Sequence, residues 1–395
     1  MNLALIVFWL SIGVVIYTYI IFPLILVMRG ILWPRHHHEG NITPSVSMII
    51  AAYNEAASIE QKLKNVSALK YPADKLEVII ASDGSDDGTN EIVATHSDST
   101  IHLLKLPRLG KADALNAAVE QSNSDILVFS DANSLYATDA IQQLVKHFAD
   151  PQVGGVAGNQ RYIKNKATQD NAGEKSYWRF DRQLKIWESA GGNTISATGA
   201  IYAIRRELFD KVPLGVTDDF VTSVRVIEHG YWLVFEPNAI AYESTTKNQQ
   251  REFGRKVRII TRGFNSVLVM SNLLNPFKYG FYALQLFTHK ILRRLLYIPL
   301  ILIFLSNIPL VLLGWPYQLA FGVQVAFYAA AIFGGVFIRN GVHLPKWLSI
   351  PTFVCMVYVA AAIASWNIVR GHKIVRWSTD SRQANEYEAE GNAIT

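Results

Sequence analysis

The chain has 395 residues, half of them apolar and only 17% charged, with a formal net charge of +5. Its one cysteine lies in an apolar segment and excludes a disulfide framework and a zinc-thiolate cluster. Much of the positive charge lies near apolar segments and in one arginine-rich stretch. This placement favours anionic lipid head groups or a phosphate-bearing substrate, and argues against nucleic acid as a partner.

The first apolar segment runs from Leu3 to Met28 without a charged side chain, longer than the roughly 20 residues that cross a bilayer. A signal peptide is the alternative, but no basic start or small-residue cleavage site is present. Basic residues follow the segment at Arg29 and Arg35, and none precedes it. The sequence therefore predicts a membrane anchor at residues 1–30, with the next domain on the cytoplasmic side of a plasma (inner) membrane.

Three consecutive histidines, His36 to His38, follow the anchor. A histidine run in a linker beside a membrane is more often a solvated spacer than a metal site. We therefore expect a spacer here.

The central region alternates short apolar runs with segments of helical pattern. The expected strands are Val46–Ala52, Leu76–Ser82, Ile101–Leu106 and Ile126–Ser130, and the expected helices are Glu55–Leu69, Gly88–Ser97 and Lys111–Gln121. This order predicts an α/β fold with a Rossmann-like, mostly parallel sheet, in which ligands bind beyond the carboxyl ends of the strands. No GxGxxG follows these strands and no Walker lysine motif occurs, which argues against a dinucleotide or P-loop site.

Acidic clusters follow two of the expected strands. SDGSDDGT begins at Ser82 and SDANS begins at Ser130. Asp86 or Asp87 is expected to cap the next helix, but capping does not need Asp83, which ends its strand, and Asp131 ends another. We expect these two strands to be neighbours in a parallel sheet, so that the two carboxylates face one crevice and bind hydroxyls and a divalent cation.

Other polar residues open the expected helices. In AAYNE, Asn54 is expected as the N-cap and Glu55 suits the first turn. GKADALNAA places Lys111 at a helix start, where it is either a solvated side chain or a phosphate ligand. In GVTDDF, Asp218 and Asp219 are either N-terminal helix residues or the source of a general base.

Arginines recur every three or four residues at positions 251, 255, 258 and 262. They therefore share one helical face, which fits either a membrane-surface helix or a clamp on a leaving diphosphate. Upstream, Tyr177, Trp178 and Trp187 are either packing residues of a helix or a stacking surface for a sugar.

The C-terminal part is again apolar. An amphipathic stretch at Asn272 to Arg294 suits an interfacial helix, and three spans are expected at Leu295–Gly314, Tyr317–Ile338 and Trp347–Val369. Basic residues flank the last span on both sides, so one basic cluster breaks the charge rule or one span is re-entrant.

Taken in this order, the motifs resemble those of the membrane-embedded family 2 glycosyltransferases, which include the cellulose and hyaluronan synthases. The resemblance implies a GT-A fold, a nucleotide-sugar donor that is usually a uridine diphosphate sugar, Mg²⁺ or Mn²⁺, and an inverting displacement. It also implies the following division of the chain: anchor 1–30, GT-A domain 44–263, interfacial region 264–294, transmembrane helices 295–370 and polar tail 371–395.

Residue roles carry over by motif. The resemblance implies nucleoside contacts from Tyr53, Glu55 and Asp83, a nucleotide contact from Lys111, metal binding by Asp131 and Asn133, a catalytic base at Asp219 and diphosphate contacts from Arg255, Arg258 and Arg262. The expected partners are the donor, a glycan or lipid-linked acceptor, membrane lipids, and export or biosynthesis proteins.

Two departures from the family pattern affect the expected product. Asn133 stands where the second acid of DxD is expected, and Ile259 stands where the tryptophan of QxxRW is expected. The second change argues against long-polymer synthesis. Transfer of a single sugar to a polyprenyl phosphate therefore remains an alternative, as does a non-catalytic membrane subunit that binds nucleotide.

Overall fold

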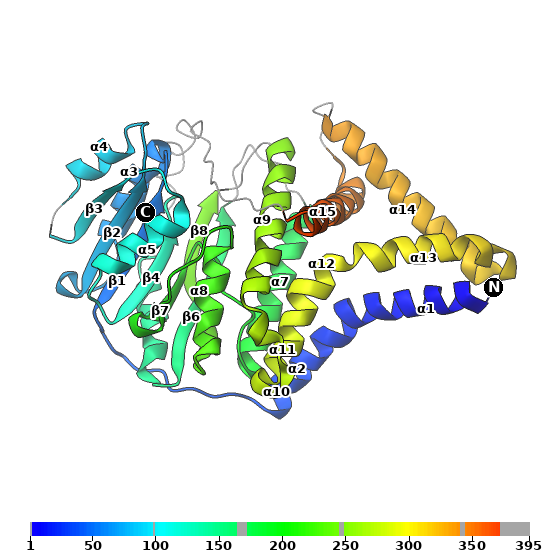
Figure 1. Cartoon of the computed structure of the whole chain (residues 1–395), viewed down its shortest axis with the longest axis horizontal. Coiled ribbons are helices and arrows are strands. Elements are labelled where there is room, and N and C mark those ends of the chain that lie inside the picture. Colours follow the sequence, from blue (N-terminus) through cyan, green and yellow to red (C-terminus); the bar gives the residue numbers. More distant parts are fainter. Residues whose placement is uncertain (1, 98, 164–171, 245–248, 340–343, 372–395) are drawn as a thin grey trace. The chain divides into compact units, whose positions relative to one another are not determined.

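The computed structural model describes residues 2–97, 99–163, 172–244, 249–339 and 344–371 (Figure 1). These residues form two compact units. The sheet unit takes in the described residues of 34–163 and 192–244, and the helical unit takes in those of 2–33, 172–191 and 249–371.

The sheet unit is built on one eight-stranded sheet in the order β3-β2-β1-β4-β7-β6-β8-β5 (Figure 1). The strands are β1 Val46–Ala52, β2 Leu76–Asp83, β3 Ile101–Leu106, β4 Ile126–Asp131, β5 Leu135–Tyr136, β6 Val153–Ile163, β7 Tyr202–Arg205 and β8 Trp232–Ser244. Strands β3, β2, β1 and β4 are parallel, as are β6 and β8, whereas β7 and β5 pair antiparallel to their neighbours. The expected α/β fold with a mostly parallel sheet is confirmed.

Helices connect the parallel strands, as the alternating sequence pattern predicts. The helices of this unit are α3 Ala56–Ser67, α4 Thr89–Thr95, α5 Lys111–Gln121, α6 Ala140–Val145 and α8 Asp218–Glu228, with short 3₁₀ turns η2 Ala73–Lys75, η3 Lys146–Ala149 and η4 Arg206–Leu208. Every residue of β1 is buried, because a central parallel strand is covered on both faces. Helix α3 buries Ile59, Leu63 and Val66, which lie on one face at helical spacing.

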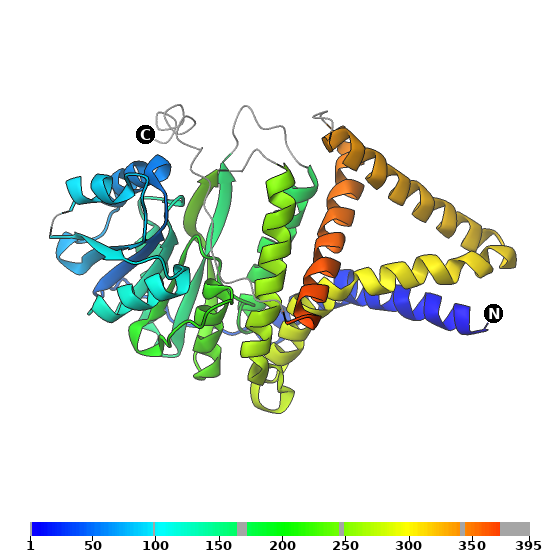
Figure 2. The ribbon, with the colours of Figure 1, turned by 45° about the horizontal axis from the view of Figure 1, so that its top comes forward.

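The helical unit contains both apolar ends of the chain (Figure 2). Its elements are α1 Asn2–Ile16, η1 Tyr17–Ile21, α2 Phe22–Leu32, α7 Ala172–Gly191, α9 Gln249–Val269, η5 Ser271–Leu274, α10 Pro276–Tyr279, α11 Phe281–Leu286, η6 Phe287–Leu292, α12 Arg293–Leu295, α13 Tyr297–Leu310, η7 Val311–Leu313, α14 Trp315–Arg339 and α15 Lys346–Val369. In both views α1 runs beside α13 (Figures 1 and 2). On α7, Trp187 packs against Phe22, Leu26 and Leu184, which favours the packing role for this aromatic residue.

Three helices among the described residues are long and apolar enough to cross a membrane: Asn2–Leu32, Trp315–Ile338 and Trp347–Val369. A fourth span requires the pair Phe281–Leu295 and Tyr297–Leu313, which is bent by 50°. The described residues thus contain helices long and apolar enough for the expected N-terminal span and for two of the expected C-terminal spans. The bent pair supplies the third C-terminal span if the pair counts as one, and its second helix covers most of the expected segment Leu295–Gly314.

The expected domain boundaries stay predictions. Helix α9 continues to Val269, past residue 263, where the GT-A domain is expected to end. Apart from Gly371, the polar tail expected at 371–395 lies outside the described residues.

Candidate active site

The candidate site lies at the carboxyl ends of the central parallel strands. Asp131 is the last residue of β4 and is in register with Ala51 of β1. Asp83 is the last residue of β2, which flanks the other side of β1. The prediction that the two acids lie on neighbouring strands is therefore wrong. The sheet extends to both sides of its first strand, so β1 lies between β2 and β4.

Asp83 is fully buried, and both of its carboxylate oxygens accept hydrogen bonds from the loop before α5. Its Oδ2 accepts from Arg108 Nη1 at 2.7 Å, and its Oδ1 accepts from the backbone N–H groups of Leu109 and Gly110 at 2.8 Å each. The Arg108 guanidinium also lies over the Tyr53 ring, 3.1 Å from its centroid. Asp83 thus fixes the loop that brings Arg108 to Tyr53, and a nucleoside contact by Asp83 stays a prediction.

The remaining acids of SDGSDDGT connect the loop after β2 to the loop after β1. Asn54 Nδ2 donates to Asp86 Oδ1 at 2.8 Å, and the Asp86 N–H donates back to Asn54 Oδ1 at 3.0 Å. Asp87 accepts from the Ala56 N–H at 3.0 Å and from the first N–H of α4 at 3.0 Å. Asp87 thus bonds the first N–H of α4 from one residue before the N-cap, Gly88, which has no side-chain cap, whereas the cap expected from Asn54 is wrong. Asn54 has a left-handed φ of 52° and lies two residues before the first residue of α3.

Glu55 follows Asn54 in the loop after β1 and is only partly exposed. Burial raises the pKa of its carboxyl to about 7, although a hydrogen bond from the Ser58 hydroxyl opposes the shift. Near neutral pH this carboxyl group therefore exists in both forms and can donate or accept a hydrogen bond. Its expected contact with a nucleoside stays a prediction.

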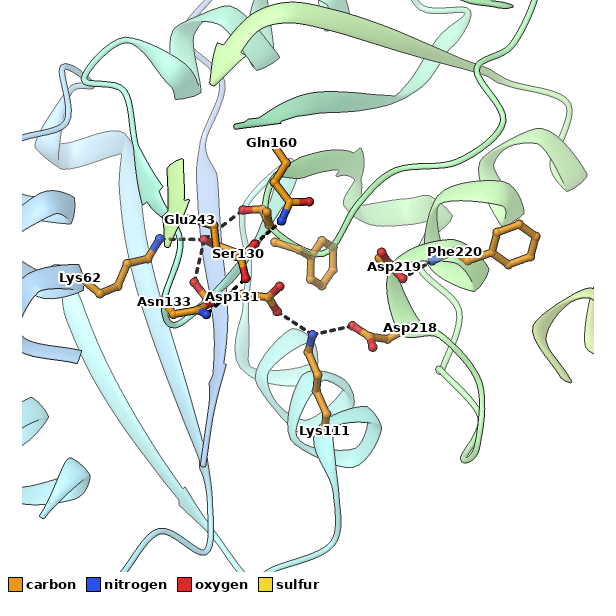
Figure 3. A network of polar contacts seen from close by, with 12 residues as sticks. Lys62, Lys111, Ser130, Asp131, Asn133, Gln160, Asp218, Asp219, Phe220 and Glu243 are labelled. Atoms are coloured by element: carbon orange, nitrogen blue, oxygen red, sulfur yellow. Dashed lines mark hydrogen bonds and ion pairs between the residues drawn. The ribbon is translucent and has the colours of Figure 1, made fainter. Parts of the chain in front are cut away.

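Lys111 brings together acids from two other elements (Figure 3). Its Nζ lies 2.7 Å from Asp131 Oδ1 at the end of β4 and 3.1 Å from Asp218 Oδ2 at the start of α8. Burial alone would lower the pKa of Lys111, but the two acids outweigh it and hold the pKa above its usual range. A charged ammonium group therefore joins two carboxylates whose residues are far apart in the chain.

Asp219 follows Asp218 in the first turn of α8 and does not contact Lys111 in this way (Figure 3). Its Oδ1 accepts from the Phe220 N–H at 2.8 Å. Burial and the negative charge of Asp218 raise the pKa of Asp219 to about 6, against the opposing charge of Lys111. A carboxylate with this pKa is ionised at neutral pH and is a stronger base than an ordinary aspartate.

Two side chains of the SDANS segment, Asp131 and Asn133, offer oxygen atoms of the kind that bind a hard divalent cation. A Cβ at Gly199 would come within 3.0 Å of Asp131 Oδ2, so glycine leaves space around this oxygen. Asn133 Nδ2 donates to Glu243 Oε1 at 3.3 Å, and Gln160 donates to the other oxygen of Glu243, so Asn133 has Oδ1 as its acceptor atom (Figure 3). Carboxylate and amide oxygens suit Mg²⁺ or Mn²⁺.

Residues 47–213 match the family model described as Glycosyl transferase family 2. This part of the chain is a family 2 glycosyltransferase domain. The match begins in β1 and includes Asp83, Lys111 and Asp131, whereas Asp219 and the arginines of α9 lie beyond its end.

Two curated bacterial proteins resemble the region that contains this domain. A probable glycosyltransferase of Bacillus subtilis, YdaM, is 30% identical over 264 residues, which cover 62% of this chain and 61% of the relative. A poly-beta-1,6-N-acetyl-D-glucosamine synthase of Staphylococcus aureus is 24% identical over 268 residues, which cover 66% of this chain and 64% of the relative. In each case the similarity spans less than two thirds of the relative.

A solved structure shares the fold over nearly the whole chain. The mannosyltransferase PcManGT from Pyrobaculum calidifontis, in complex with GDP-Man and Mn²⁺, superposes with a TM-score of 0.68 at 24% identity. The match covers 93% of this chain and 100% of that protein. It confirms the expected GT-A fold.

One residue that supports the family 2 domain could not be recognised from sequence motifs. Lys62 of α3 is fully buried; its Nζ donates to Ser130 Oγ at 2.7 Å and to the Ser134 carbonyl oxygen, so it holds the segment that carries Asp131 and Asn133. Burial lowers its pKa to about 7. The feature of the sequence that could have indicated a buried role for Lys62 is its position on the apolar face of α3.

The expected diphosphate ligands Arg255, Arg258 and Arg262 all belong to α9 of the helical unit. Burial, followed by the charges of Arg262 and Arg255, lowers the pKa of Arg258 below its ordinary value. Their spacing of three and four residues puts the three side chains on one face of α9. Their contact with a diphosphate stays a prediction.

Proposed function

We propose that this protein is a membrane-bound, metal-dependent, inverting glycosyltransferase. It would move a sugar from a nucleotide-diphosphate donor, a uridine diphosphate sugar in the first instance, to a hydroxyl group of a growing polysaccharide or glycan. The observation that carries the proposal is the convergence of Asp131, Lys111 and Asp218 beside Asp219. The polysaccharide synthase name of the Staphylococcus aureus relative and the GDP-Man and Mn²⁺ of the Pyrobaculum calidifontis structure support it.

The residues divide the reaction between donor and acceptor. Asp131 and Asn133 would hold a Mg²⁺ or Mn²⁺ ion, which supplies positive charge to the leaving diphosphate. Lys111 keeps Asp131 and Asp218 in place, and Tyr53 with Arg108 offers a flat cationic surface to the nucleoside. Arg255, Arg258 and Arg262 are the proposed further contacts of the diphosphate.

Asp219 is the proposed base. It takes the proton of the acceptor hydroxyl as that oxygen forms a bond to the anomeric carbon, and the bond from this carbon to the diphosphate oxygen breaks. One in-line displacement inverts the anomeric configuration and needs no covalent enzyme intermediate.

Two other functions fit particular features of the sequence. Ile259, in place of the tryptophan of QxxRW, favours transfer of one sugar to a polyprenyl phosphate. The uncharged Asn133 favours a subunit that binds nucleotide without turnover.

We propose that the domain lies on the cytoplasmic face of the plasma (inner) membrane, because basic residues follow the first span. There it would contact membrane lipids and export or biosynthesis partner proteins.

The test is a donor screen with product sizing. Purified full-length protein in detergent receives labelled nucleotide sugars, Mn²⁺ and membrane lipid extract. We expect label from one donor class in a polysaccharide or oligosaccharide ladder. If the label appears only in a lipid that carries a single sugar, the protein transfers one sugar to a lipid and does not make a polymer. If no donor gives a labelled product, both functions are contradicted.

The pH dependence of transfer tests the base. Because Asp219 acts as a carboxylate, kcat/KM should fall about tenfold per pH unit below about pH 6 and level off above it. Lys111 opposes the raised pKa, so Lys111→Gln should move the midpoint to higher pH. Lys211→Gln, which removes an exposed lysine paired with Glu120, is the matched control and should leave the midpoint unchanged.

Two results from the pH dependence of kcat/KM decide whether Asp219 is the base. Glu55→Gln separates the two acids with raised pKa values, because the midpoint should persist without Glu55. A midpoint that disappears in Glu55→Gln, or that does not move in Lys111→Gln, would contradict the role of Asp219.

A further inference from the structure

A second cluster of ligating side chains lies where the linker before β1 packs against η3. His37 and Glu39 come from the linker and His147 comes from η3, and one ligand atom of each lies within 4.8 Å of the others. His37 Nε2 is 2.6 Å from His147 Nδ1, and Glu39 Oε1 is 3.9 Å and 3.7 Å from these two nitrogens. The His37 side chain is only 17% exposed, so this histidine is not the solvated spacer that the sequence pattern favours.

Glu236 of β8 fixes the orientation of the buried His147 ring. Its Oε2 lies 2.9 Å from His147 Nε2 and 2.7 Å from Lys146 Nζ, and its Oε1 accepts from the Asn238 N–H at 2.7 Å. Because Glu236 holds the Nε2 side of the ring, the other ring nitrogen, Nδ1, faces His37 and Glu39. Histidines that bind metals commonly donate the N–H of their other ring nitrogen to a carboxylate in this way.

The surrounding charges also suit a cation. Lys146 Nζ lies 3.1 Å from Glu39 Oε2, which leaves Oε1 on the side of the two imidazoles. The carboxylates of Glu39 and Glu236 outnumber the one ammonium group of Lys146 beside the two imidazoles.

We propose that His37, Glu39 and His147 form a binding site for a divalent transition metal of the zinc class, with water as the fourth ligand. A tetrahedral zinc ion with bonds of about 2.0–2.1 Å holds its ligand atoms roughly 3.3 Å apart. The two distances from Glu39 are slightly longer than this and the distance between the imidazoles is shorter, so a small rotation of His37 would make room for the ion. Two nitrogen donors with one oxygen donor favour Zn²⁺, Co²⁺ or Ni²⁺ over Mg²⁺.

The site would act on the linker and not on sugar transfer. It joins residue 37 to residue 147 and so ties the segment between the first span and β1 to the sheet unit. Because the ligands meet only in the folded chain, bound metal stabilises the fold. The proposal does not depend on the proposed transferase function.

The test is metal binding to the full-length protein in detergent. Chelator-treated protein is titrated with Co²⁺ and then Zn²⁺ in excess Mg²⁺, which occupies oxygen-only sites. We expect one Co²⁺ per chain with the visible absorption of a tetrahedral site, displacement of Co²⁺ by Zn²⁺, and a Zn²⁺-dependent increase in Tm. His37→Ala and the exposed Glu39→Gln should each weaken binding at least tenfold.

The flanking histidines provide matched controls. His36→Ala and His38→Ala remove exposed residues of the same linker and should retain wild-type affinity and the Tm shift. Equal affinity in wild type, His37→Ala and Glu39→Gln would overturn the proposal, as would equal losses in all four variants. Glu39→Gln keeps the test decisive if His37→Ala does not fold, because it changes only a surface carboxylate.

Discussion

Replacing Asp219 by asparagine is expected to reduce sugar transfer about 10³-fold, within the range that loss of a general base produces. Asparagine has nearly the same shape and keeps an oxygen for the Phe220 N–H, so α8 should start as it does in the wild type. It cannot take a proton from the acceptor hydroxyl. Donor binding should change less than threefold, because the ion pairs of Lys111 go to Asp131 and Asp218. Initial transfer rates and equilibrium binding of the nucleotide measure the two effects separately.

Asp210→Asn is the matched control for this change. Asp210 precedes α8, and its half-exposed side chain pairs with Arg225 and His229, so its loss should leave the transfer rate within about twofold. Full turnover in Asp219→Asn would show that another group acts as the base. A loss of donor binding equal to the loss of rate would show that Asp219 binds the donor instead.

Replacing Asp131 by asparagine is expected to weaken Mn²⁺ binding at least 100-fold and turnover at least 1,000-fold. The change removes the one negative charge of the two proposed metal ligands, because Asn133 is neutral. It also removes one of the two carboxylates that hold Lys111. Electron paramagnetic resonance of free Mn²⁺, titrated with protein in the presence of nucleotide, measures the affinity.

Asp74→Asn changes an exposed acid of η2 in the same unit and serves as its control, with no expected change in Mn²⁺ affinity. Wild-type Mn²⁺ affinity in Asp131→Asn would remove this residue from the metal site. Reduced affinity in both variants would indicate nonspecific binding to acidic side chains.

Strands β1, β2, β3 and β4 were predictable because each is a mostly apolar run between helical segments. Strand β1, for example, is buried along its whole length. Strand β8 has no such pattern, since Glu236, Pro237 and Asn238 interrupt it and Glu236 is buried by pairing with Lys146 and His147. The polar side chain of Glu236 in β8 pairs with residues that are far away in the chain. The spacing of apolar residues along a strand carries no information about such partners.

In the candidate site, too, local sequence patterns were visible but contacts between distant residues were not. Asp83, Asp131 and Lys111 were recognisable because they end strands or begin a helix, but their contacts were not. Asp83 is bonded to the loop of Arg108, a residue with no motif of its own, and Lys111 reaches Asp218, 107 positions along the chain. Strand order and helix placement create these pairs, and neither is set by local sequence.

The most direct measurement is the initial rate of nucleoside diphosphate release by the purified full-length protein, across a panel of nucleotide sugars, with and without Mn²⁺ and acceptor. We predict release from one donor class that requires the cation and is accelerated by the acceptor. Metal-dependent nucleotide binding without release from any donor would contradict the transferase function and favour the non-catalytic subunit.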